Sequence, residues 1–275
     1  MLMASVWRCR WDGRPPAVKE LMTEVVPQPT ILVTDCPIFS GPIKSDRLNT
    51  AVGIDLGSLD RSLAVSREVR LPRASVVVTT VARHLIRISK SGEKVESIVV
   101  YGSEQDPAAH PDIRTITENL RELRNKWFSK AKLSLVTDCG LLTPEMPRLL
   151  NFYDRVYARF EYGTAKSYAA ATGHKPADYA TACGMLTGLS NLIIVTRVPR
   201  GEVDASSETE VKAWIKKVGE LKPREVWIQT VEAKGKKTKA PAKTRLTEIA
   251  AEVTDKTGIA AHIVTGEQIY TRPTA

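Results

Sequence analysis

The sequence contains no run of apolar residues that approaches the roughly 18 that a membrane-spanning helix needs. Its first 14 residues place Trp7 and Trp11 among charged side chains instead of building the apolar centre of a signal peptide. We therefore expect a cytoplasmic protein with no membrane contact.

Cysteine is scarce, and its four copies lie far apart, at Cys9, Cys36, Cys139 and Cys183. No two of them form a C-x-x-C pair, and no histidine lies at the spacing of a zinc ligand from any of them. Neither a disulfide framework nor a zinc knuckle is therefore expected. Cys139 has no evident partner base, so we interpret it as a buried thiol without a catalytic role.

Glycine and proline, with 16 copies each, are too few for a collagen-like or low-complexity chain. Of the 275 residues, 43% are hydrophobic and 26% are charged, which is ordinary globular material. The chain is long enough for one large domain or two small ones. Prolines punctuate the first 28 or so residues without a sustained period, so we expect residues 1–30 to form an N-terminal extension.

Basic residues exceed acidic ones, and the formal net charge is +9. Residues 216–245 carry ten lysines and arginines against three glutamates, which supplies most of the excess. The preferred interpretation is a solvated loop and helix face. The alternative is a nucleic-acid or phosphate contact through Lys234, Lys236, Lys237, Lys239 and Lys243. The loop has no interleaved aromatic residue for base stacking, so sequence-specific recognition of single strands is not favoured.

From about residue 74 onward, short β-branched runs alternate with amphipathic stretches. The pattern predicts helices near residues 111–126, 144–150, 177–189, 206–221 and 246–256. It predicts strands at residues 74–81, 96–101, 133–137, 155–160, 192–198, 225–231 and 260–264. Repeated strand-then-helix units with short connections indicate an α/β fold, which is a barrel, an open barrel or a doubly wound sheet. In all three, active groups lie at the carboxyl ends of the strands.

Several segments near those carboxyl ends resemble, in order, a branch of the radical S-adenosylmethionine enzymes. Residues 39–48 and 52–56 are similar to the opening "YGPVPSRRLGxSLGIDL", and residues 99–107 and 110–113 to "ITFSGSGEPTLNPDI". Residues 135–142 resemble "VITNGSLL", residues 155–163 occupy the place of "VKVSLDA", and residues 222–230 resemble "KPDRVQLNT". Residues 244–250 resemble "LSEERLEEIA", so the likeness covers roughly residues 38–265.

The resemblance implies a partial (βα)6-type TIM-like barrel of the radical S-adenosylmethionine type, with parallel strands and outer helices. It places this barrel at residues 31–265 and leaves a C-terminal tail at residues 266–275. In such enzymes three cysteines hold an iron–sulfur cluster, and the fourth iron binds the methionine end of S-adenosylmethionine.

The chain departs from the family at the cluster itself. The three cysteine positions fall on Ser62, Ser66 and Val69. Serine hydroxyls ionise far above neutral pH and valine has no donor atom, so we predict that the iron–sulfur cluster is absent. The glycine-rich segment that approaches the cofactor in the family is also altered. Ser103 and Gln105 replace glycines and Asp106 replaces a glutamate.

If the barrel forms, Asp106, Asp138, Glu161 and Arg197 lie at strand ends around one mouth. Such a set could bind an amine or a nucleoside, and S-adenosylmethionine is the cofactor that the resemblance suggests. The alternative, which we prefer, is that these side chains are caps and loop salt bridges. Aromatic residues gather at residues 152–168, and a few of them are candidates to line the mouth or a partner surface.

Three functions follow from these observations. The first is a noncatalytic relative of the radical enzymes that acts as a structural or regulatory partner of an active enzyme, or as a homo-oligomer. The second is a non-redox enzyme or nucleoside-binding protein that reuses the barrel mouth. The third, which rests only on charge, is a basic accessory protein of RNA or DNA.

Overall fold

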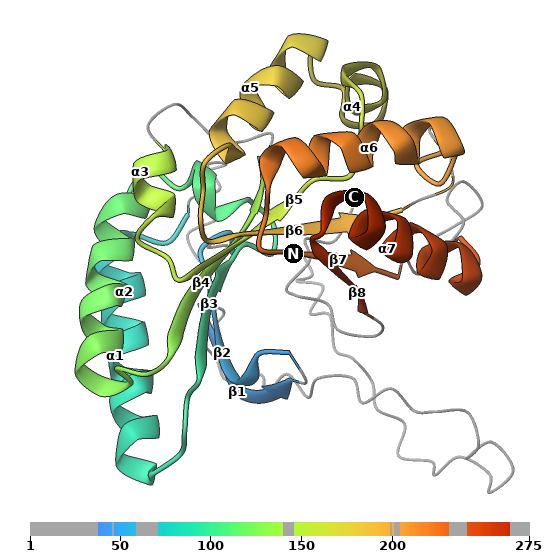
Figure 1. Ribbon diagram of the computed structural model, residues 1–275. Coiled ribbons are helices and arrows are strands. Elements are labelled where there is room, and N and C mark those ends of the chain that lie inside the picture. The colour runs from blue at the N-terminus through green and yellow to red at the C-terminus, as the bar shows by residue number, and fades with distance from the viewer. Residues whose placement is uncertain are drawn as a thin grey trace, which may run out of the picture. The chain divides into compact units, whose positions relative to one another are not determined.

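The computed structural model describes residues 38–45, 47–58, 71–139, 146–198, 200, 204–230 and 241–264. The chain divides into two units, residues 1–30 and 31–275, and every described residue belongs to the second. Figure 1 shows the elements of this unit.

The described strands form one eight-stranded sheet whose spatial order is the order of the sequence. Strand β1 (Phe39–Ser45) pairs antiparallel with β2 (Asn49–Asp55) as a hairpin. From β2 onward every neighbouring pair is parallel. The remaining strands are β3 (Ser97–Tyr101), β4 (Lys132–Asp138), β5 (Arg155–Arg159), β6 (Leu192–Arg197), β7 (Glu225–Gln229) and β8 (Ala260–Val264).

At least one helix connects each parallel strand to the next, as Figure 1 shows. These helices are α1 (Ala74–Ser91), α2 (Ile113–Trp127), α3 (Met146–Leu150), α4 (Ala165–Thr172), α5 (Pro176–Leu186), α6 (Glu208–Leu221) and α7 (Lys243–Thr257). The 3-10 turn η1 (Pro107–Ala109) precedes α2. Parallel strands require such crossovers, because a tight turn can join only antiparallel neighbours.

The two faces of the sheet pack differently. In β5, Val156 and Ala158 belong to the large apolar core that the helices cover, whereas Tyr157 belongs to a separate cluster. Side chains alternate in direction along a strand, so this second cluster marks the face opposite the helices. Its buried members are Leu48, Ala51, Val99, Tyr157, Ile193, Val195, Trp227 and Val264. The prediction of an α/β fold with parallel strands and outer helices is confirmed.

One predicted strand is wrong. The β-branched side chains of residues 74–81 favour an extended strand, but these residues form the first half of α1. Val77, Val81, Leu85 and Ile88 are all buried, at the spacing of one helix face. Tertiary burial of this stripe therefore outweighs the modest helix penalty of valine and threonine.

The other predicted helices and strands are present with boundaries shifted by a few residues. In α6, Ser207 caps the helix by accepting a hydrogen bond from the Glu210 amide, 3.4 Å away. The hairpin strands β1 and β2 and the short helix α4 are elements that the sequence pattern does not predict. Helix α4 begins at a local cap, in which the Thr164 hydroxyl accepts from the Ser167 amide.

Candidate functional site

The candidate site is the edge of the sheet at which the parallel strands end. Asp138 and Arg197 are the last residues of β4 and β6, while Asp106 and Glu161 follow β3 and β5 in the loops. The sequence-based placement of these four side chains at strand ends therefore agrees with the structure. The hydrogen-bond and ion-pair partners of these four side chains determine whether this edge of the sheet can bind a ligand.

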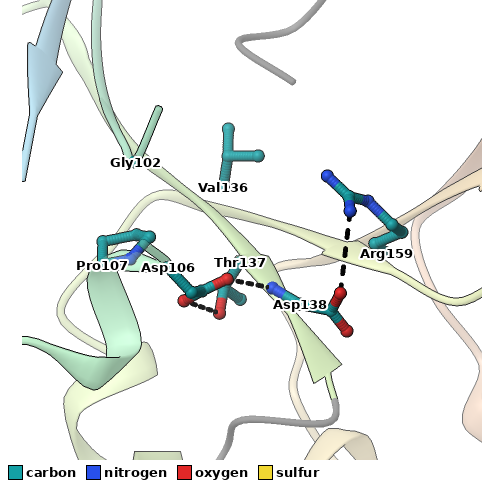
Figure 2. Close-up of a pocket in the computed structure, with 7 residues that line it drawn as sticks. All are labelled: Gly102, Asp106, Pro107, Val136, Thr137, Asp138 and Arg159. Carbon is teal, nitrogen blue, oxygen red and sulfur yellow. Dashed lines mark hydrogen bonds and ion pairs between the residues drawn. The ribbon is translucent and has the colours of Figure 1, made fainter. Parts of the chain in front are cut away.

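Asp106 is buried and both of its carboxylate oxygens accept hydrogen bonds from protein groups (Figure 2). One oxygen accepts from the Thr137 hydroxyl at 2.8 Å and from the Ala108 amide at 2.8 Å. The other accepts from the Asp138 amide at 2.5 Å. Burial raises the pKa of Asp106 to about 6, although these hydrogen bonds act in the opposite direction. Asp106 thus joins the loop after β3 to the end of β4.

Asp55, the last residue of β2, makes the equivalent connection between the ends of β2 and β3. Its Oδ1 accepts from the Gly57 amide at 2.9 Å and from the Ser103 amide at 3.0 Å. Burial raises the pKa of this carboxyl group as well. Sequence reasoning did not select Asp55 as a site residue. The signal that could have identified it is its position as the last residue of a strand, which is also the position of Asp138 in β4.

Two ion pairs connect the ends of the following strands, one from β4 to β5 and one from the loop after β5 to β6. The Asp138 carboxylate lies 3.7 Å from the Arg159 guanidinium at the end of β5. Glu161 accepts from Nε of Arg197 at 2.5 Å and from its Nη2 at 3.3 Å, across to β6. Burial lowers the pKa of Arg197, but the adjacent Glu161 carboxylate outweighs burial and the pKa is raised overall. The arginine stays charged.

Each of these carboxylates therefore bonds to a group on the following strand or loop, from β2 through β6. The predicted cofactor-binding residues lie along one edge, but within the described structure their charged groups face each other or backbone amides. The arrangement ties neighbouring strand ends together. It matches the interpretation as caps and loop salt bridges.

The segment after β3 packs tightly against the segment after β2. A Cβ built on Gly57 would lie 1.9 Å from the Gln105 carbonyl oxygen, and one built on Gly102 would lie 1.7 Å from the same atom. The Gln105 amide also donates to the Gly57 carbonyl, at 3.2 Å. Both glycines are thus required by the close approach of the Gln105 backbone, which fills the space beside them.

Two cavities open at this edge. The first, lined by Gly102, Asp106, Thr137, Asp138 and Arg159 among others (Figure 2), has a volume of about 20 Å³, space for about one water molecule. The second has a volume of about 140 Å³ and lies beside α4. The strand-end groups Asp138, Arg159, Glu161 and Arg197 line it together with aromatic side chains from the loop after β5 and from α4 and α5.

Several predicted residues lie outside the described residues. They are the cluster positions Ser62, Ser66 and Val69 and the basic residues Lys234, Lys236, Lys237 and Lys239. Lys243 is described, and it is the exposed first residue of α7.

The sequence between β2 and α1, where the resemblance places an iron–sulfur cluster, contains no cysteine to bind one. Among the described residues, Cys139 and Cys183 are free and buried, and no group of three or more side chains is arranged to hold a metal ion. Burial, with a smaller contribution from Asp138, raises the pKa of the Cys139 thiol well above its ordinary value. This thiol is protonated at neutral pH, so it supplies no thiolate for metal binding or for nucleophilic attack.

Within the described ranges, no helix is long and apolar enough to cross a membrane.

No protein-family model matches the sequence, and no curated protein gives a significant match to it. Solved structures do match. A radical SAM methyltransferase from Sphaerobacter thermophilus superposes with a TM-score of 0.53 at 14% identity, covering 81% of this chain and 68% of that one. Streptococcus suis SuiB bound to the precursor peptide SuiA gives a TM-score of 0.51 at 16% identity, covering 74% of this chain and 45% of that one.

Identities this low establish the fold alone. The chain has the α/β fold of radical SAM enzymes, with parallel strands and outer helices, and the predicted fold class is confirmed. The chain spans less than half the length of the SuiB chains that it matches.

Proposed function

We propose that this protein is a noncatalytic, cytoplasmic member of the radical SAM superfamily that has no iron–sulfur cluster and serves as a structural or regulatory partner of an active enzyme. One observation carries the proposal. The charged groups at the strand ends, where an enzyme of this fold would present groups to a cofactor, are bonded to each other or to backbone amides from β2 to β6.

The filled space beside Gly57 and Gly102 supports the same proposal. Glycine in the family's corresponding segment permits a close approach to the cofactor. Here the Gln105 backbone makes that approach. The residues at the family's three cysteine positions support the proposal as well. Ser62, Ser66 and Val69 offer no soft, ionised ligand to iron.

Anaerobic reconstitution with iron and sulfide tests the proposal. The wild-type protein is expected to yield no stoichiometric cluster, measured by iron analysis and by visible absorbance. A matched variant, Ser62→Cys/Ser66→Cys/Val69→Cys, restores the three thiols and shows whether their loss accounts for the result. A stable cluster with one equivalent of four irons in the wild-type protein would overturn the proposal.

The second candidate function is a nucleoside-binding or S-adenosylmethionine-binding protein without redox chemistry. The observation that favours it is that Asp106, Asp138, Glu161 and Arg197, the side chains that would contact such a ligand, lie along one edge of the sheet. Calorimetry with S-adenosylmethionine distinguishes the two candidates. Saturable binding that is lost in both Asp106→Ala and Glu161→Ala supports the second function, and no heat at all supports the first.

A further inference from the structure

Helix α1 presents a row of exposed side chains in which no acid offsets the basic residues. The helix lies on the outside of the sheet beside α2 (Figure 1). Val76, Arg83, Arg87 and Lys90 are exposed and follow one another at spacings of seven, four and three residues, which places them on one helix face. We call these four residues the α1 row. At 1.5 Å per residue the row is about 21 Å long.

The cations of the α1 row differ from those of other helices in having no acidic partner. Helices α6 and α7 each hold two cations in ion pairs with acids on the same helix, namely Lys212–Glu208, Lys217–Glu220, Arg245–Glu248 and Lys256–Glu252. Helix α1 contains no aspartate or glutamate, and within the described residues Arg83 and Lys90 make no ion pair. Their charges are therefore available to an anionic partner.

Arg87 is held in place by a group that does not neutralise it. Its Nη2 donates to Nδ1 of His84 at 2.5 Å, and the ring of His84 stacks on Phe39 with centroids 4.4 Å apart. Burial, with a smaller contribution from Arg87, lowers the pKa of His84, so the imidazole is neutral at neutral pH. Arg87 is thus oriented by a neutral acceptor and keeps its full charge.

Val76 distinguishes a protein partner from a nucleic acid. It is 48% exposed, and among the described residues no other large apolar side chain is as open to solvent. A single exposed valine is ordinary by itself, but this one extends the line of cations at the amino-terminal end of α1. A phosphate backbone would pair with the cations and leave Val76 uncovered. A protein segment with an apolar side chain would cover Val76 as well, and so gains the burial of its methyl groups.

The shape of the surface favours a helical segment. Side chains of a second helix can pack between those of an exposed helix, whereas an extended strand laid on α1 would leave its own backbone groups unpaired. The cations lie in the carboxyl-terminal part of α1. Acids are most favourable near the amino terminus of a helix, so an antiparallel arrangement suits both helix dipoles.

We propose that the α1 row is the docking surface for an antiparallel helix of a partner protein, with acidic side chains toward the amino terminus of that helix and an apolar side chain toward its carboxyl terminus. The inference rests on the proposed function, because it names the surface through which the partner enzyme would bind.

A capped, alanine-rich helical peptide provides the probe. It carries three glutamates at successive spacings of three and four residues, followed seven residues later by a leucine, which mirrors the α1 row. Fluorescence anisotropy of the labelled peptide with the full-length protein at low ionic strength is expected to show saturable binding to one site. The reversed peptide is expected to bind roughly two- to fivefold more weakly, because its glutamates lie at the unfavourable end of the helix. No saturable binding, or tighter binding of the reversed peptide, would overturn the proposal.

A charge-reversal variant locates the site. Arg83→Glu/Lys90→Glu is expected to lower the affinity for the peptide at least tenfold. The matched control, Lys166→Glu/Lys216→Glu, makes the same change of net charge at exposed positions on α4 and α6 and should leave the affinity within about threefold. A peptide whose outer two glutamates are replaced by lysine should bind Arg83→Glu/Lys90→Glu better than it binds the wild type. Equal losses in both variants would show that only net charge matters and would reject the site.

The apolar end of the row separates the protein from a nucleic acid. Val76→Ala is expected to weaken peptide binding about threefold and to leave the binding of a single-stranded oligoadenylate unchanged. Oligoadenylate that binds as tightly as the peptide, and that Arg83→Glu/Lys90→Glu releases, would assign the row to a nucleic acid and overturn the proposal.

The two proposals can fail separately. Reconstitution with iron and sulfide does not involve the α1 row, so a protein that forms no cluster and does not bind the peptide rejects the docking surface alone. A protein that binds the peptide and also forms a stoichiometric cluster keeps the docking surface and rejects the noncatalytic function.

Discussion

The carboxylate of Asp106 accepts a hydrogen bond from the backbone amide of Asp138, so a side chain from the loop after β3 closes the end of β4. Asp106 is buried, and it accepts two further hydrogen bonds with its other oxygen. The balance between burial and these bonds determines how the fold responds to pH.

Asp106 is expected to make the protein less stable as the pH rises through the weakly acidic range. Its pKa is about 6 in the folded protein against an ordinary value of 3.8, so the unfolded chain loses this proton first. The contribution is fully present below about pH 4 and is lost by about pH 6, and it amounts to about 3 kcal/mol. Urea unfolding of wild type and Asp106→Asn at several pH values measures it.

Because the raised pKa of Asp55 acts in the same direction, only the difference between wild type and variant isolates Asp106. Asp255→Asn, an exposed aspartate in α7, is the control and should leave the pH profile unchanged. Parallel profiles for wild type and Asp106→Asn would show that the buried carboxyl does not titrate as described.

Gly102→Ala is expected to destabilise the fold by more than about 2 kcal/mol, because the new Cβ would collide with the backbone of Gln105. Backbone cannot move aside as a flexible side chain can. Gly184→Ala is the control: it lies within α5 with open space around it, so helix propensity should stabilise the protein by about 0.5–1 kcal/mol. Chemical denaturation of both variants provides the comparison, and equal stabilities would contradict the packing of this loop.

Glu161 and Arg197 are expected to show a coupling free energy of about 1–3 kcal/mol in a double-mutant cycle with Glu161→Gln and Arg197→Met. The Glu161 side chain is only 7% exposed and meets the guanidinium through two contacts, so solvent screens the pair weakly. The exposed pair Glu208 and Lys212 on α6 is the reference, and its coupling should be near the error of measurement. A result in which both cycles give the same small value would show that the strand-end pair is effectively solvated.

Glu210→Ala is expected to loosen α4 and to destabilise the protein by about 2–3 kcal/mol. This buried carboxylate accepts from the Gly163 amide and the Ser167 hydroxyl, both at 2.6 Å, and so fixes the start of α4 to α6. Glu208→Ala, on the same helix but exposed, should have little effect. Hydrogen exchange across residues 163–172 distinguishes local loosening from global loss. Unchanged protection in Glu210→Ala would rule out this anchoring role.

The sequence predicted those elements whose local pattern and tertiary burial agree. Helix α6 is an example, since its cap, its apolar stripe and its terminating Pro223 all indicate the same boundaries. Residues 74–81 show the opposite case. Their β-branched composition favours a strand, whereas the burial of Val77 and Val81, which continues at Leu85 and Ile88, has the spacing of a helix. Packing against the folded core decides in favour of the helix.

At the candidate site, strand ends could be located from the sequence but their partners could not. Asp106 and Asp138 were expected at one edge, yet the bond between them depends on the parallel register of β3 and β4. The roles of Gly57 and Gly102 could not be predicted either, since each depends on where the fold places the backbone of Gln105. The cavity beside α4 depends on a short helix that has no strong periodic signal.

The sheet order, in which each strand lies beside the one that precedes it in the sequence, has a consequence for biosynthesis. No strand has to be inserted between two others that are already paired. As the ribosome releases the chain, each new strand with its helix can dock on the edge that the previous one exposes. The nascent protein can therefore grow its sheet in one direction, and a ribosome that pauses late leaves the earlier pairings intact.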